Sequence, residues 1–353
     1  MLNIKDYRDE LIVYATKYQA LFEAISDATI MITGAAGLIG SYIVDLIVTS
    51  NEVFNTNIKV VAIDRDRDLL NSRFPDNLDH RISKLALDIT EDKLSAVDVD
   101  YVIHAASNTS PIDYAQKPID TVKTNSIGTY NMLEYCINTN VKRFMFCSSV
   151  EAYGKNNGDV DFFSEDYSGY VDCNTVRAGY PSGKRVSEAM CNAFAAEYPE
   201  FDFVIARIGR IYGPTVLTND AKAPTMFIRN AVNGEDIVLK SDGMQEFSFA
   251  YVADCAIAML VILTKGKHGN AYNISDDRIV KLKEFAEIAA RLGNSKVIYE
   301  VPTAVDVAGY SKITKALMCT EKLKSLGWTA ETSLFDGISN TVKYLKQLKG
   351  EEL

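Results

Sequence analysis

A short apolar segment that leads directly into a glycine-rich turn constrains this chain more than any other feature. Residues 29–33 read Thr-Ile-Met-Ile-Thr, and residues 34–40 read Gly-Ala-Ala-Gly-Leu-Ile-Gly before a second apolar segment begins. Strand, glycine turn and helix in this order are typical of a parallel sheet that binds a dinucleotide. Gly34 permits the tight turn, Gly37 lets the backbone approach a pyrophosphate at the helix N-terminus, and Gly40 lets helix and strand pack closely.

The second predicted strand, residues 58–63, supports this interpretation because it ends at an acidic residue. The carboxylate of Asp64 is placed to accept a hydrogen bond from the adenosine ribose 2′-hydroxyl, which favours NAD. Arg65 and Arg67 follow directly. Since a nearby arginine accommodates a 2′-phosphate, NADP is not excluded.

Strand and helix patterns continue to alternate over about 200 residues. Further strands are predicted at 85–89, 101–106, 143–148 and 203–207, and helices at 119–139 and 181–198. This alternation predicts an α/β fold with a Rossmann-type doubly wound parallel sheet. Three regions are expected: an N-terminal helical extension at 1–28 with a helix at 5–25, a dinucleotide-binding domain at 29–214, and mainly a substrate-binding lobe at 215–353. Some strands of this lobe are allowed to return to the main sheet, and its helices are predicted at 281–293 and 334–348.

Composition excludes several classes of protein. The net charge of −10 without a basic patch argues against a nucleic-acid partner. No apolar run approaches the roughly 20 residues that span a bilayer, so we expect no membrane partner. Six cysteines without a Cys-x-x-Cys pair, and a charged N-terminus, favour a reducing, cytoplasmic location. The three histidines have no metal-ligand spacing, so no metal is expected.

Tyr180 and Lys184 supply candidate chemistry. Four residues apart, they fall on one face of a helix. An ammonium near a phenol stabilises the phenolate and makes it a general base at neutral pH. By itself the pair is weak evidence, because such a pair more often marks an exposed helix start.

Taken in order, the motifs resemble the extended short-chain dehydrogenase/reductase family, and within it the NAD-dependent nucleotide-sugar epimerases, dehydratases and decarboxylases. The likeness rests on the glycine turn, Asp64, Asp88-Ile89, His104-Ala105-Ala106-Ser107, Asn125, the run 148–154, Tyr180-x-x-x-Lys184, Tyr212-Gly213-Pro214 and Leu326-Gly327-Trp328. Residues 118–129, 164–169 and 183–191 are most similar to UDP-glucuronate decarboxylases.

The resemblance implies a transient oxidation of a sugar hydroxyl by tightly bound NAD. Tyr180 is the implied base, Lys184 its partner and a ligand of the nicotinamide ribose, and Ser149 the hydrogen-bond donor to the reacting oxygen. Glu151 is a candidate proton shuttle beside the transient ketone. The predicted cofactor-binding residues are Gly34, Gly37, Leu38, Ile39, Gly40, Asp64, Arg65, Asp88, Ile89, Ala105, Ala106, Ser107, Asn125, Ser148, Tyr180, Lys184 and Arg207.

Several positions depart from the family pattern. Val150 replaces the acid that dehydratases place after the catalytic Ser or Thr, which disfavours 4,6-dehydration. Lys315 stands where decarboxylases have an arginine, and a lysine lacks the bidentate fork. Phe247 replaces an arginine that binds the nucleotide phosphates, and Arg210 replaces an asparagine. The predicted substrate-binding residues are Asn108, Arg210, Lys222, Arg229 and Phe247.

These features predict first an epimerase of a nucleotide-activated sugar, and second a UDP-glucuronate-type decarboxylase. A 4,6-dehydratase is less favoured, and a non-catalytic NAD-binding scaffold is the alternative from another class. A homodimer is expected through helices 119–139 and 181–198, as the resemblance implies. Their apolar residues fit intramolecular packing equally well (Met132, Leu133, Cys136, Met190 and Phe194).

Overall fold

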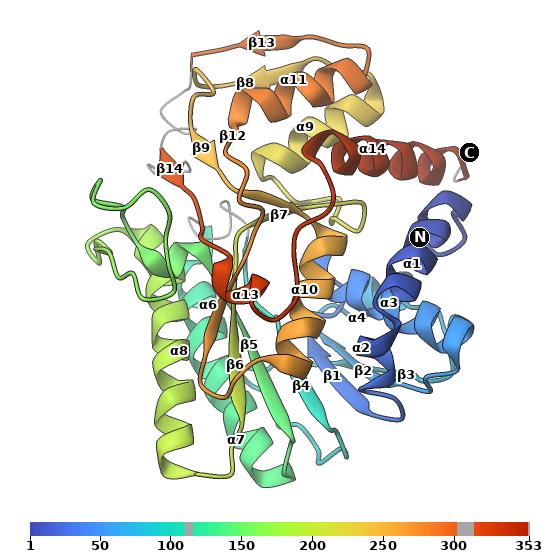
Figure 1. The fold of residues 1–353 in the computed structure, drawn as a ribbon, viewed down its shortest axis with the longest axis vertical. Helices are drawn as coiled ribbons and strands as arrows, with labels where there is room; N and C mark the ends of the chain where they lie inside the picture. The colour runs from blue at the N-terminus through green and yellow to red at the C-terminus, as the bar shows by residue number, and fades with distance from the viewer. Residues whose placement is uncertain (110–115, 302–313, 352–353) are drawn as a thin grey trace.

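A seven-stranded parallel sheet forms the centre of the molecule (Figure 1). The computed structural model describes residues 1–109, 116–301 and 314–351. The strand order is β11-β6-β5-β4-β1-β2-β3, and every neighbouring pair runs parallel. This confirms the predicted α/β doubly wound fold. The strands are β1 (Thr29–Thr33), β2 (Lys59–Asp64), β3 (Ile82–Ala86), β4 (Tyr101–His104), β5 (Arg143–Ser149), β6 (Phe203–Ile208) and β11 (Ala271–Ile274).

Helices cover both faces of the sheet, which is why its strands are apolar almost throughout. Ile30 and Ile32 of β1 pack into a core with α3 (Leu38–Phe54) and α10 (Val252–Lys265). Met31, between them, faces the opposite core with α7 (Thr129–Thr139) and α8 (Gly179–Glu197). Met132, Leu133 and Cys136 of α7 are buried in that second core. No helix within the described ranges is long and apolar enough to cross a membrane.

Three predicted elements have different bounds in the structure. The third strand lies at 82–86 rather than 85–89, because the chain turns at Asp88, whose carboxylate accepts hydrogen bonds from the backbone and side chain of Thr90. The N-terminal helix is broken at Tyr18 into α1 (Lys5–Lys17) and α2 (Gln19–Glu23). The helix predicted at 119–139 comprises α6 (Pro118–Lys123), a π-helical turn η1 (Thr124–Gly128) and α7.

The C-terminal part of the chain is divided between the main body and a smaller lobe. Its β11 completes the central sheet and its α10 packs against one face of that sheet, whereas α9 (Ala223–Asn233), α11 (Leu282–Leu292) and α14 (Leu334–Glu351) lie together at the top of Figure 1. Small sheets pair β7 (Arg210–Tyr212) with β10 (Phe249–Tyr251), and β8 (Ile237–Leu239) with β13 (Val297–Tyr299). A third joins β9 (Glu246–Phe247) to β12 (Val280–Lys281) and β14 (Lys315–Ala316). Short helices are α4 (Arg67–Arg73), η2 (Val150–Tyr153), η3 (Val176–Ala178) and α13 (Glu321–Lys324).

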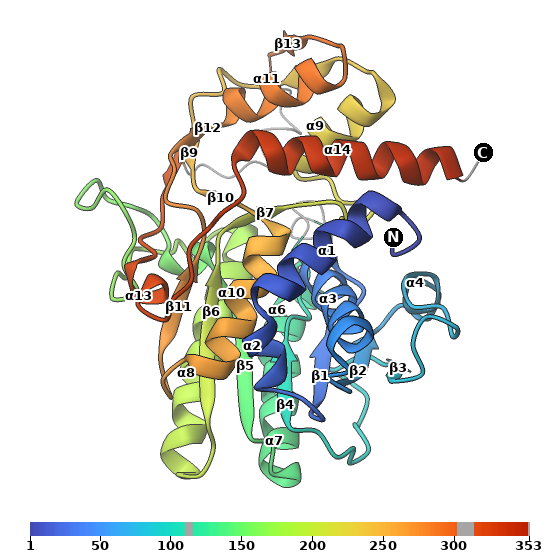
Figure 2. The ribbon, with the colours of Figure 1, turned by 45° about the vertical axis from the view of Figure 1, so that its right-hand side comes forward.

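The Glu10 carboxylate on α1 helps to join this lobe to the main body. Glu10 accepts hydrogen bonds from Tyr42 of α3 at 2.8 Å, from Tyr251 of β10 at 2.9 Å, and from Tyr344 and Asn340 of α14 at 3.2 and 3.1 Å. Burial raises the pKa of Glu10, although these hydrogen bonds oppose the shift. Figure 2 shows α1 lying across α3 and below α14. The N-terminal extension is therefore a brace between the two parts of the molecule.

Replacing Glu10 with alanine should destabilise the protein by about 3 kcal/mol, because buried hydroxyl and amide donors lose their acceptor. Chemical denaturation measures this change. Asp9→Ala, at an exposed position of the same helix, should change the unfolding free energy by less than about 0.5 kcal/mol and is the matched control. A Glu10→Ala protein as stable as the Asp9→Ala protein would contradict the role of the brace.

Candidate functional site

The predicted site residues meet where the parallel strands end. Gly34 follows β1 with φ of 69°, and a Cβ added to it would lie 2.9 Å from Cα of Ala106, which follows β4. A Cβ on Gly40 would lie 2.6 Å from the carbonyl oxygen of Gly34. The turn is thus packed backbone against backbone, on β4 on one side and on α3 on the other. This matches the roles that the sequence assigned to the first and third glycines.

The second glycine marks the open side of the turn. A Cβ on Gly37 would meet, within 4 Å, only the Gly34 carbonyl oxygen, at 3.3 Å. Gly37, Leu38 and Ile39 are partly exposed at the start of α3, and no side chain of the described chain caps this 17-residue helix at its N-terminus. Its first backbone N–H groups are therefore available to an anion. The turn fits a dinucleotide pyrophosphate.

Acidic residues follow the next two strands. Asp64 accepts a hydrogen bond from the Asp66 N–H at 3.2 Å, and burial raises its pKa despite the backbone hydrogen bonds that it receives. Asp88 accepts from Thr90, and the neighbouring Ile89 is buried against Gly128 of η1. Asp64 is thus placed as predicted at the end of β2, whereas Ile89 serves packing.

A hydrogen-bond chain fixes the loop after β4. The Thr33 hydroxyl lies 2.8 Å from Nδ1 of His104 and accepts from the Ala106 N–H at 3.1 Å. Ser107 donates to the side chain of Asn125 at 2.8 Å, which joins this loop to the π-turn η1. Burial, reinforced by the charge of Lys184, lowers the pKa of His104 to about 3, so the imidazole is neutral. The structure thus joins Ser107 and Asn125, two of the residues predicted to bind the cofactor.

Lys184 lies buried next to Tyr180 at the start of α8. Its Nζ donates to the Cys147 carbonyl at 2.8 Å, and lies 5.7 Å from the ring centroid of Tyr180 and 4.9 Å from that of Phe146. Burial lowers the pKa of Lys184 to about 8, although Cys147 and Glu188 favour the charged form. Tyr180 is also buried. The alternative of an exposed helix start is therefore wrong.

Ser149 and Glu151 lie at the end of β5, beside a residue that sequence reasoning missed. The Ser149 hydroxyl accepts from the Glu151 N–H at 3.2 Å and begins η2. The Glu151 carboxylate accepts from Arg177 at 2.6 Å, and their side chains are 16% and 28% exposed. Arg177 precedes Tyr180 by three residues but is 26 residues from Glu151 in sequence, so no local pattern could identify the pair.

Two residues predicted to bind the cofactor are engaged in a network within the protein. Arg207 forms a bidentate pair with Glu188, at 2.7 and 3.0 Å, and donates to the Glu165 carbonyl at 2.6 Å. Ser148 donates to the same Glu188 at 2.5 Å. In this arrangement Arg207 and Ser148 tie β6 and β5 to α8, so the structure gives them a positioning part.

The predicted substrate residues fall into three groups. Asn108 bonds to Arg65 and Asp120. Lys222 pairs with the Asp220 carboxylate at 2.7 Å and donates to Thr109 at 3.2 Å, while Arg229 donates to the Asp220 carbonyl at 2.9 Å. The Arg210 guanidinium stacks on the ring of Phe247, 3.8 Å from its centroid. Lys315, at the position of the decarboxylase arginine, pairs with Asp161 at 2.8 Å.

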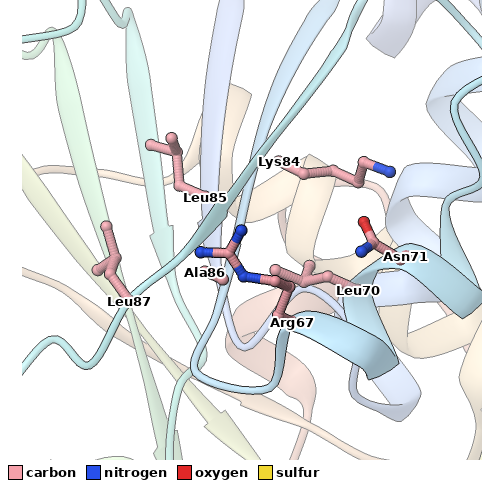
Figure 3. Close-up of a pocket in the computed structure, with 7 residues that line it drawn as sticks. All are labelled: Arg67, Leu70, Asn71, Lys84, Leu85, Ala86 and Leu87. Carbon is pink, nitrogen blue, oxygen red and sulfur yellow. The ribbon is translucent and has the colours of Figure 1, made fainter.

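A pocket of about 300 Å³ lies elsewhere, between α4 and the edge strand β3 (Figure 3). It contains none of the residues predicted for the site, so it has no part in the chemistry considered below. Its lining residues are Arg67, Leu70, Asn71, Lys84, Leu85, Ala86 and Leu87. Among the described residues, no group of three or more His, Cys, Asp or Glu side chains is arranged to hold a metal ion.

Comparison with known proteins agrees with this geometry. Residues 30–275 match the model of the NAD dependent epimerase/dehydratase family. UDP-glucuronic acid decarboxylase 1 of Xenopus tropicalis is 31% identical over 325 residues, covering 90% of this chain and 72% of that protein. UDP-glucuronic acid decarboxylase 5 of Arabidopsis thaliana is 32% identical over 321 residues, covering 89% of this chain and 88% of that protein. The structure of UDP-glucose 4-epimerase from Thermotoga maritima superposes with a TM-score of 0.77 at 25% identity, covering 91% of this chain and 99% of that one.

The buried charge of Lys184 predicts a pH-dependent stability. Its folded pKa of about 8 lies below the usual 10.5, so the destabilisation is complete below pH 8 and disappears as the pH rises to about 10.5. Lys184→Met should therefore raise the unfolding free energy of the nucleotide-free protein at pH 7. The net gain is about 2 kcal/mol after the loss of the hydrogen bond to Cys147 is taken into account. The difference from wild type should shrink toward pH 10.

Denaturation midpoints at pH 7 and pH 10 measure this difference. Lys265→Met, an exposed lysine on α10, is the control and should show no such trend. A Lys184→Met difference that is the same at both pH values would contradict the inferred burial of charge.

Proposed function

Because the chain belongs to the NAD-dependent epimerase/dehydratase family, we propose that it decarboxylates a nucleotide-linked uronic acid, with UDP-glucuronic acid as the first substrate to test. Two observations support this over the epimerase that sequence reasoning favoured. The curated relatives cited above are named as UDP-glucuronic acid decarboxylases. The structural observation that carries the proposal is the position of Arg177. Its guanidinium donates to the Glu151 carboxylate, and the residue comes three positions before Tyr180 in the sequence.

The glycine turn, Asp64 and the loop Ala105–Ser107 would hold NAD, with Lys184 near the nicotinamide ribose. When bound, NAD supplies the acceptor and then the donor of a hydride at the sugar carbon. The fit rests on the open side of Gly37 and on the uncapped start of α3. These residues would bind and orient NAD, and other side chains would carry out the proton transfers.

We assign removal of the proton from the reacting hydroxyl to Tyr180. The Lys184 ammonium lies 5.7 Å from the ring centroid of Tyr180, in a buried setting where a charge acts more strongly than in water. It favours the phenolate, and therefore favours removal of the proton. Ser149 would donate a hydrogen bond to the same oxygen. The Cys147 carbonyl holds Lys184 in place at 2.8 Å.

Arg177 would bind the substrate carboxylate in exchange for Glu151. A guanidinium matches a carboxylate with two parallel hydrogen bonds. Lys315 is the weaker candidate, because it is paired with Asp161, whose side chain is 86% exposed. A ketone two bonds from the carboxylate lets the bond to carbon dioxide break, with its electron pair held as an enolate. The carbon that loses the carboxylate then takes up a proton. We assign its delivery to Glu151, which takes up that proton from water after Arg177 has released its carboxylate.

Arg210 is our candidate for the nucleotide phosphates. Phe247 occupies the position where the family carries an arginine, and Arg210 stacks on its ring. The aromatic ring orients the guanidinium through a cation–π contact, so the positive charge is retained although its position in the sequence differs. Lys222 and Arg229 are both bonded to Asp220, so we consider them weaker candidates for binding the phosphates.

Epimerisation is the second candidate, because Lys315 is not the expected arginine and a UDP-glucose 4-epimerase is among the similar structures. Incubation with UDP-glucuronic acid and analysis of products by mass distinguishes the two. Decarboxylation yields carbon dioxide and a UDP-pentose, whereas epimerisation yields UDP-galacturonic acid of unchanged mass. An isomer of unchanged mass as the sole product would contradict the decarboxylase proposal.

Arg177→Ala should lower kcat/KM for UDP-glucuronic acid by about 10- to 100-fold, the effect of losing a charge-assisted pair. Lys315→Ala is the matched comparison and should reduce kcat/KM less than threefold. If Lys315→Ala were the more damaging change, the carboxylate ligand would be Lys315 and the part given to Arg177 would be wrong.

We also propose a homodimer through α6, α7 and α8. Apolar side chains of this surface are exposed: Ile119, Val122, Ile127, Tyr130 and Val186. Val122→Lys and Val186→Lys should each convert the dimer into single chains in light scattering. Val13→Lys, on the exposed side of α1, is the control and should leave the mass unchanged. A wild-type protein with the mass of one chain would contradict the proposal.

A further inference from the structure

Arg65, the residue directly after the predicted ribose ligand Asp64, is held by two partners. Its Nη1 donates to Oδ2 of Asp120 at 3.0 Å, and its Nη2 donates to Oδ1 of Asn108 at 3.0 Å. Asn108 in turn donates to the same Asp120 oxygen at 2.6 Å, which closes a triangle of hydrogen bonds. Both terminal nitrogens of the guanidinium are therefore engaged by the protein itself.

The triangle bridges the ends of two strands that are not neighbours. Arg65 follows β2 and Asn108 follows β4, with β1 between them, and Asp120 comes from α6. Because adjacent strands lie about 4.8 Å apart, the bridge spans roughly 10 Å at the strand ends. It thus draws the Arg65 side chain past the end of β1, toward β4 and α6.

The electrostatic surroundings of Arg65 are acidic. Burial by itself would lower the pKa of Arg65. The hydrogen bond to Asp120 and the charges of Asp120, Asp88 and Asp64 outweigh this effect and raise the pKa. One guanidinium faces three carboxylates in this region. The other arginine of the segment, Arg67, extends over β3 toward Ala86 in the pocket of Figure 3.

We propose that Asp120 and Asn108 determine cofactor specificity by holding Arg65 away from the ribose, so that Asp64 selects NAD over NADP. An arginine beside the second strand is otherwise the group that accommodates the 2′-phosphate. A phosphomonoester carries a charge of about −1.5 to −2 at neutral pH. For NADP to recruit Arg65, the guanidinium must leave Asp120, whose carboxylate then loses its cation while the phosphate also faces the carboxylate of Asp64.

Asp120→Asn tests this proposal through nucleotide affinity, independently of turnover. Kd values for NADH and NADPH are measured by fluorescence titration of nucleotide-free protein at fixed ionic strength. The released Arg65 gains a charge-assisted contact with the 2′-phosphate, so NADPH should bind about tenfold more tightly. NADH affinity should change less than about threefold, because NADH carries no group for the released guanidinium.

Asp68→Asn removes the same charge from an exposed position on α4 and is the control for general electrostatics; it should leave the affinity ratio near that of wild type. Arg65→Ala should abolish the gain in the Asp120→Asn protein and have little effect on NADPH affinity in the wild-type background. A tenfold loss of NADPH affinity on Arg65→Ala alone would overturn the proposal, since Arg65 would already bind the phosphate. An unchanged ratio in Asp120→Asn would overturn it as well.

Discussion

The contact between Gly34 and Ala106 is the constraint on which the rest of the site depends. With no side chain at residue 34, the backbone after β1 lies against the backbone after β4. This closeness leaves the outer side of Gly37 open at the start of α3. It also sets the loop that carries Ala106, Ser107 and Asn108 beside the turn.

Polar networks connect distant elements around the predicted catalytic residues. Glu188 joins Ser148 of β5 to Arg207 of β6, and Arg185 donates to the carbonyls of Ala152, Tyr153 and Gly169. Lys184, directly before Arg185 on α8, is buried, and its pKa is lowered. Helix α8 thus carries the buried ammonium of Lys184. The next residue on the helix, Arg185, holds the turn that contains Glu151 by its hydrogen bonds to Ala152 and Tyr153. Burial of this ammonium group reduces the stability of the folded protein.

The N-terminal helix α1 connects the C-terminal lobe to the main body. The strands alone do not fix the C-terminal lobe, because that lobe contributes only α10 and β11 to the central layers. Glu10 collects donors from α3, β10 and α14 around one carboxylate. Lys222 of the lobe reaches Thr109 of the β4 loop on the other side. Both contacts help to hold the lobe against the main body.

The sequence by itself determined the sheet, the glycine turn and the order of the site residues along the strand ends, because hydrophobic periodicity and glycine spacing are local properties of the chain. It misplaced the third strand by three residues, since the apolar run 85–89 continues through a turn made by Asp88 and Thr90. Only the tertiary structure decided which charges meet. Arg177 with Glu151, Arg65 with Asp120, and Arg207 with Glu188 are 26, 55 and 19 residues apart, and no local pattern links residues at such separations. Ion pairs of this kind form where the fold brings side chains together, so the motifs could indicate the chemistry while the partners of each charge had to come from the structure.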